Sequence, residues 1–120
     1  MNKKTLVLGS SLKPSRYSNL AIHRLVENGI EVVAIGLRKG EVAGVQIEVG
    51  KPEFKGIETV TLYLNPKRQQ DYYNYIISLQ PKRVIFNPGT ENDEFATVLT
   101  KNNIEVDIAC TLVLLTTKQY

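Results

Sequence analysis

Several residue types that build compact functional centres are scarce in this chain of 120 residues. It contains one Cys, Cys110, one His, His23, and no Trp. A single Cys excludes an intramolecular disulfide and any zinc or iron–sulfur site built from clustered Cys. A single His excludes His-rich metal sites. The sequence therefore predicts a fold that is stabilised by its hydrophobic core, without a metal.

Long apolar runs and a strong charge of one sign are also absent. No apolar run approaches the ~20 residues that span a bilayer, and the apolar segment near the N-terminus is too short for a secretory signal. We therefore expect a cytoplasmic protein without a membrane partner. The 15 Lys and Arg against 12 Asp and Glu give a net charge of +3, which is too small to indicate a nucleic acid partner. Length and even composition predict one domain over residues 1–120.

Short apolar runs rich in β-branched residues predict strands, and they alternate with segments of helical periodicity. The predicted strands are residues 5–8, 31–36, 59–64, 83–86 and 104–108, with a further short strand around residues 45–47 inside a loop of residues 40–50.

The helix boundaries are predicted from capping residues. A first helix begins at the N-cap Ser18 and stops at Gly29, and a second begins after the N-cap Asn65 and ends before Pro81. A capping box of Thr90 and Asp93 predicts the start of a third. The apolar run at residues 112–115 fits a helix or a strand equally well.

This alternation predicts an α/β fold: a single Rossmann-like, doubly wound, mostly parallel sheet with helices on both faces. Ligands bind such sheets at the carboxyl ends of the strands. We therefore expect the functional site in the loops at residues 9–17, 36–40 and 87–92, together with Asn65.

The loop after the first predicted strand lacks the glycine fingerprint of dinucleotide-binding proteins. A Gly-x-Gly-x-x-Gly pattern that starts at Gly9 would need glycines where this chain has Ser11 and Pro14, and no Walker sequence follows. Hydroxyls and cations take their place, and these can bind an anion through side chains as well as amides. The candidates are Ser10, Ser11, Lys13 and Arg16.

The end of the second predicted strand carries a second signal. NAD-binding proteins place an Asp or Glu there to accept the ribose hydroxyls, whereas this chain has Arg38 and Lys39. Two cations attract a phosphate on the ribose, so the pattern favours NADP or coenzyme A over NAD. The alternative is that both side chains are solvated surface groups, as Lys and Arg in loops usually are.

No complete set of catalytic residues is recognisable, so we expect neither catalysis nor a metal site. His23 is predicted to face solvent. Cys110 is predicted to be a buried small hydrophobe, with a thiol near the pantetheine end of a bound CoA as the alternative. Tyr72, Tyr73 and Tyr75 fit core packing better than base stacking.

Three features taken together resemble a known family. The stretch from Gly9 to Ser18 fits the pattern Gly-x-Ser-x-x-Pro-x-Arg-x-Ser, residues 87–92 read Asn-Pro-Gly-Thr-Glu-Asn, and Cys110 follows. In this order and spacing the chain is similar to the small stand-alone CoA-binding domain proteins of bacteria, which resemble the nucleotide-binding domain of the succinyl-CoA synthetase α-subunit. The resemblance covers nearly the whole chain. It departs from the family at Ile35-Gly36-Leu37, where a Val-Asn-Pro-like triplet is common.

The resemblance implies a Rossmann-like fold that binds the CoA nucleotide. The matching positions are Gly9, Ser10, Ser11, Lys13, Pro14 and Arg16 in the phosphate loop, Lys39 after the second strand, and Asn87, Pro88, Gly89 and Asn92 in the late loop. The leading hypothesis is a non-catalytic module for coenzyme A or an acyl-CoA. The alternatives are an NADP-dependent oxidoreductase-like or ligase accessory protein and a weak RNA or protein interaction module. The sequence leaves open a homodimer or a partner enzyme.

Overall fold

The computed structural model describes residues 3–120. These residues form one seven-stranded sheet in the order β3-β4-β2-β1-β5-β6-β7. Neighbouring strands are parallel except for the antiparallel pair β3 and β4. The strands are β1 (Thr5–Ser10), β2 (Val32–Gly36), β3 (Gly40–Val42), β4 (Val45–Glu48), β5 (Thr59–Leu62), β6 (Arg83–Phe86) and β7 (Glu105–Ile108). The predicted α/β class and mostly parallel sheet are confirmed.

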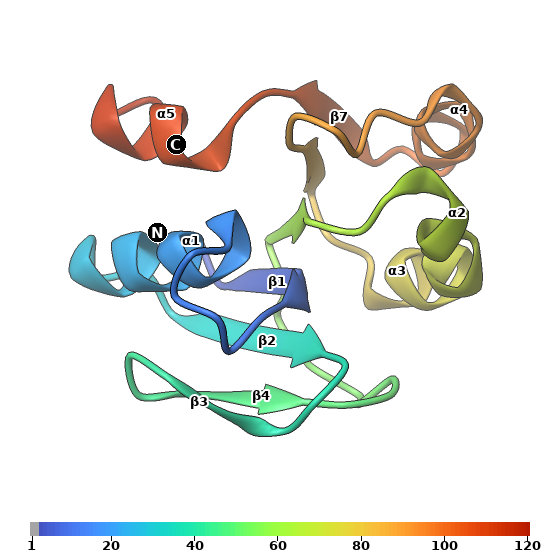
Figure 1. Ribbon diagram of the computed structural model, residues 1–120. Coiled ribbons are helices and arrows are strands. Elements are labelled where there is room, and N and C mark those ends of the chain that lie inside the picture. The colour runs from blue at the N-terminus through green and yellow to red at the C-terminus, as the bar shows by residue number, and fades with distance from the viewer. Residues whose placement is uncertain (1–2) are drawn as a thin grey trace.

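Helices cover both faces of the sheet (Figure 1). The helices α1 (Tyr17–Glu27) and α5 (Thr111–Thr116) pack together on one face. The other face carries α2 (Pro66–Gln69), the 3-10 turn η1 (Gln70–Tyr72), α3 (Tyr73–Leu79) and α4 (Asp93–Lys101). Chain order reverses between the adjacent strands β1 and β5, which is where open α/β sheets form their ligand crevice. Within residues 3–120, no helix has both the length and the hydropathy that crossing a bilayer requires.

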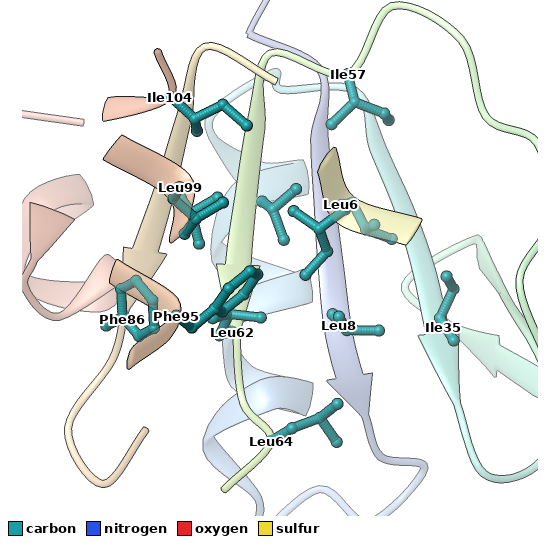
Figure 2. Packing of buried hydrophobic residues seen from close by; sticks show 13 residues of the cluster. Leu6, Leu8, Ile35, Ile57, Leu62, Leu64, Phe86, Phe95, Leu99 and Ile104 are labelled. Carbon is teal, nitrogen blue, oxygen red and sulfur yellow. The ribbon is translucent and has the colours of Figure 1, made fainter. Parts of the chain in front are cut away.

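The central strands are buried on both faces because helices cover both sides of the sheet and alternate side chains point toward each side. Leu6 and Leu8 of β1 face α3 and α4, where Phe86 packs edge-on against Phe95 with ring centroids 5.9 Å apart (Figure 2). Val7, between the two leucines, faces α1 and α5 instead. This double burial explains why β1 reads as an uninterrupted apolar run rather than an alternating one.

Three predicted boundaries are wrong in detail. The first helix begins at Tyr17 with Arg16 as its N-cap, and Ser18 is buried within it. The second helical region is broken by the 3-10 turn η1. The third helix begins at Asp93 and is capped by Asn92, whose side chain accepts a hydrogen bond from the Phe95 amide. The predicted cap Thr90 lies two residues earlier, where its hydroxyl donates to the Asn87 carbonyl.

Two regions that the sequence left partly open are now assigned. Residues 40–50 contain a β-hairpin, since β3 precedes the expected short strand and pairs with it. The run at residues 112–115 belongs to the helix α5. Gly29 follows the C-cap of α1 with a φ of +73°, as predicted for a helix stop.

Candidate functional site

A cavity of about 930 Å³ opens at the carboxyl ends of the central strands. Its walls come from the loops that follow β1, β2, β5 and β6. This is the crevice expected for a doubly wound sheet, and its volume lies in the range of small-molecule sites. Topology therefore brings together loops that are up to about eighty residues apart in the chain.

Most of the predicted site residues line this cavity, and a few do not. Those that line it are Gly9, Ser10, Ser11, Lys13, Arg16, Arg38, Pro88 and Gly89. Those that lie outside it are Pro14, Lys39, Asn87 and Asn92. Pro14 and Lys39 are exposed neighbours of lining residues, so a role for either of them in binding stays a prediction.

Two glycines allow the first loop to approach the neighbouring strands closely. Gly9 has a φ of +96°, and a Cβ there would lie 2.9 Å from the backbone carbonyl carbon of Tyr63. A Cβ on Gly36 would lie only 2.3 Å from the carbonyl oxygen of Ser10. A larger side chain at position 36 would therefore push β2 away from the loop.

The first loop is held in shape by its own polar groups. Asn19, buried in α1, donates from Nδ2 to the Ser11 carbonyl at 3.0 Å. The Ser11 hydroxyl accepts from the Lys13 amide at 3.1 Å, and the Arg16 amide donates to the Lys13 carbonyl at 3.1 Å. Ser10 is buried and donates its hydroxyl to the Val7 carbonyl. The loop is therefore preorganised, with its cations free to point outward.

Four cationic side chains line the cavity: Lys13, Arg16, Arg38 and Arg68. All four are exposed, and none of them takes part in an ion pair among the described residues. Arg16 caps α1 without a side-chain hydrogen bond, and the first turn of α1 carries no acidic residue. The positive end of the α1 dipole therefore adds to the cations instead of being neutralised locally. The arrangement suits an anionic ligand with more than one charged group.

Asn87 and Asn92 have structural roles in this fold. Asn87 is buried, donates to the Thr61 hydroxyl and the Leu62 carbonyl, and accepts from the Thr111 amide. Asn92 caps α4 and donates to Gln69 and Tyr73. The late Asn-Pro-Gly motif therefore shapes the cavity wall, where Pro88 and Gly89 provide the lining.

Four residues that the sequence analysis did not propose contribute to the site. Arg68, Tyr63 and Tyr72 line the cavity, and the buried Gln69 joins two of its loops. Arg68 could have been suspected from its place one turn after the predicted cap Asn65. Nothing in the local sequence distinguishes Gln69 from a surface residue, because its partners are 5 and 21 residues away.

Tyr63 has an unusual environment on the cavity wall. Its hydroxyl is buried and has no hydrogen-bond partner among residues 3–120. Burial, reinforced by the nearby Cys110, raises the pKa of Tyr63 to about 12, although the hydroxyls of Thr111 and Thr61 lie close enough to offset part of this effect. Tyr63 is therefore neutral throughout the physiological range.

The remaining chemical candidates, His23 and Cys110, do not line the cavity. His23 is exposed on α1, as predicted. Cys110 is the N-cap of α5 and is partly exposed, so the expectation of a buried thiol is wrong. Among residues 3–120, no cluster of His, Cys, Asp and Glu could hold a metal ion.

Comparisons with known proteins bear on both fold and family. A crystal structure of an uncharacterized protein is 50% identical, superposes with a TM-score of 0.96, and is covered over 99% of its length by 100% of this chain. A hypothetical protein from Pyrococcus horikoshii OT3 is 26% identical with a TM-score of 0.86, over 98% of this chain and 84% of that one. The cell-free ID.343 protein from Thermus thermophilus is 22% identical with a TM-score of 0.87, over 99% and 91%, and supports the fold alone.

No curated protein sequence matches the chain. A family model described as a CoA binding domain, in contrast, matches residues 3–116. That range contains every strand and helix of the sheet and every residue that lines the cavity. The chain belongs to the CoA-binding domain family.

Proposed function

We propose that this protein binds coenzyme A, or an acyl-CoA, in the cavity at the carboxyl ends of β1, β2, β5 and β6. The observation that carries the proposal is the set of cations on the cavity wall that have no ion-pair partner in the described chain. Membership of the CoA-binding domain family supports the same ligand. CoA has a diphosphate and a separate ribose phosphate, so it needs cations in more than one place.

The first loop and the end of β2 divide these phosphates between them. Lys13 and Arg16 lie beside the N-terminus of α1, where amides and the helix dipole also favour an anion, and they suit the diphosphate. Arg38 follows β2, where the adenosine ribose lies in doubly wound folds, and it suits the ribose phosphate. Lys39 adds a second positive charge next to it without lining the cavity.

The protein is proposed to bind without catalysing a reaction. The lining offers hydroxyls, amides and cations but no acid–base pair, and Cys110 and His23 lie elsewhere. A service role follows, in which the protein carries or senses the CoA nucleotide for another protein. NADP also carries a phosphate on its adenosine ribose, so it is the competitor that the test must include.

Thermal unfolding with and without ligand tests the proposal. A ligand at 100 times its Kd stabilises the native state by about 2.7 kcal/mol, so CoA is expected to raise the Tm by several degrees. The double variant Lys13→Ala, Arg16→Ala should lose most of this increase. The matched control is Lys82→Ala with Lys101→Ala, which removes the same charge from exposed residues outside the cavity. CoA should raise the Tm of this control as it does for the wild type.

Two results would contradict the proposal. The first is a Tm that does not respond to CoA or to an acyl-CoA at millimolar concentration. The second is a stronger response to NADPH, with NADPH displacing CoA, which would favour the oxidoreductase-like alternative.

A further inference from the structure

Gln69 is fully buried at the end of α2 and uses its side-chain amide for three hydrogen bonds. Nε2 donates to the Leu64 carbonyl at 2.9 Å and to the Thr90 carbonyl at 2.8 Å. Oε1 accepts from Nδ2 of Asn92 at 3.0 Å. Both donors and one acceptor site are therefore satisfied, which an ordinary surface glutamine does not need.

The two carbonyls that Gln69 binds belong to different walls of the cavity. Leu64 follows β5 and Thr90 follows β6, and both residues line the cavity. These loops are separated by α2, η1, α3 and β6 along the chain. Gln69 thus links the two loops through one side-chain nitrogen, so a shift of one loop would move the other.

This wall differs in charge from the rest of the site. Three of the four cations in the cavity lining, Lys13, Arg16 and Arg38, lie on the first loop and after β2. The wall joined by Gln69 contributes one cation, Arg68, beside the apolar or neutral surfaces of Leu64, Tyr72 and Thr90. For a ligand whose phosphates occupy the cationic region, this wall offers the part of the lining with the fewest charges for its uncharged part.

We propose that Gln69 is a positioning residue, which holds the loops after β5 and β6 at the spacing that fits the uncharged pantetheine part of the ligand. This inference rests on the proposed function, because it assumes that the cavity takes CoA. Gln69 touches backbone carbonyls and not the cavity itself, so it acts through Leu64 and Thr90.

The substitution Gln69→Glu isolates this role because it keeps the size of the side chain. The carboxylate keeps an acceptor for Asn92 but loses both donors, and it faces two carbonyl oxygens with a negative charge. The two loops should separate. Asn92→Asp is a second variant, which keeps the α4 cap, removes the donor to Gln69 and Tyr73, and places a carboxylate oxygen against Oε1 of Gln69.

Calorimetric titration with two ligands separates positioning from general stability. CoA probes the whole cavity, whereas adenosine 3′,5′-bisphosphate has the ribose phosphate but no pantetheine arm. Gln69→Glu is expected to lower the affinity for CoA about tenfold, because a buried hydrogen-bond partner is lost. The affinity for the bisphosphate should stay within about twofold of the wild-type value. Asn92→Asp should also lower the affinity for CoA, by a smaller factor.

A matched control accounts for lost stability. Thr5→Val removes the hydrogen bond that the Thr5 hydroxyl donates to the Lys3 carbonyl and its hydrogen bond with the Tyr120 hydroxyl, both at the opposite end of β1 from the cavity. It should lower the Tm while leaving the affinity for both ligands unchanged. All titrations are made well below the Tm of each variant.

The possible outcomes have distinct meanings. The proposal is supported if Gln69→Glu lowers the affinity for CoA and not the affinity for the bisphosphate. If Gln69→Glu does not fold, the same result in Asn92→Asp supports it. If the affinity for both ligands falls equally, or the affinity for CoA is unchanged, the positioning role of Gln69 is overturned and the proposed function is not. Wild-type protein that binds neither ligand overturns the proposed function and this inference with it.

Discussion

Substitution of Gly36 by Ala tests the close contact between β2 and the first loop. The added Cβ would lie 2.3 Å from the Ser10 carbonyl oxygen and 3.0 Å from a methyl carbon of Ile47. The carbonyl would have to move by about 1 Å to restore an ordinary contact, and overpacking of this kind costs about 1–3 kcal/mol. Because the obstacle is backbone in the centre of the sheet, we expect the upper half of that range.

Differential scanning calorimetry measures the result. A loss of about 2–3 kcal/mol corresponds to a fall in Tm of roughly 10 °C for a domain of this size. Displacement of Ser10 and Ser11, which line the cavity, should also weaken CoA binding. Gly36→Ala with wild-type Tm and wild-type affinity would refute the proposed packing of this loop.

Gly40→Ala provides the matched control for that substitution. Its Cβ would meet side-chain carbons of Leu12 at 2.5 and 2.9 Å. Leu12 is 42% exposed, so its side chain can rotate away. We expect a cost below about 1 kcal/mol, and thus a clear difference between two substitutions that are chemically identical.

Two further predictions concern Tyr63 and Asn65. Unfolded Tyr ionises near pH 10 while folded Tyr63 stays neutral to about pH 12, so this ionisation costs the folded protein no stability below pH 10 and roughly 2–3 kcal/mol as the pH rises to about 12. Tyr63→Phe should therefore have the wild-type free energy of unfolding at pH 7, because the hydroxyl has no hydrogen-bond partner in the described chain. In urea unfolding at alkaline pH the variant should lose less stability than the wild type, and an equal loss would count against the burial of this hydroxyl. Asn65→Ala removes the cap bond to the Arg68 amide and should cost about 1 kcal/mol, measured by urea unfolding, while an unchanged midpoint would show that the cap is dispensable.

The architecture could be predicted from the sequence because it depends on local patterns. The apolar run of β1 and the alternation of strands with helices are visible without any knowledge of contacts. The loops that line the cavity follow from topology, since the carboxyl ends of parallel strands meet at one edge. For that reason the cations Lys13, Arg16 and Arg38 could be placed in one site in advance.

The details that the sequence missed depend on contacts between distant residues. Thr90 fits a capping box locally, but it lies in the turn before α4, where its hydroxyl donates to the Asn87 carbonyl, and Asn92 caps the helix. Asn87 matches a binding motif, yet the amide of Thr111 and the hydroxyl of Thr61 use its side chain. Such competition between partners is decided only by the folded chain.

The contribution of the ribose phosphate is the most direct measure of the account as a whole. Isothermal titration of the wild-type protein with CoA and with dephospho-CoA compares two ligands that differ only in that group. We expect CoA to bind about tenfold more tightly, equivalent to roughly 1.4 kcal/mol, and Arg38→Gln to remove the difference. Equal affinity for the two ligands, or no binding of either, would contradict the assignment of the cavity.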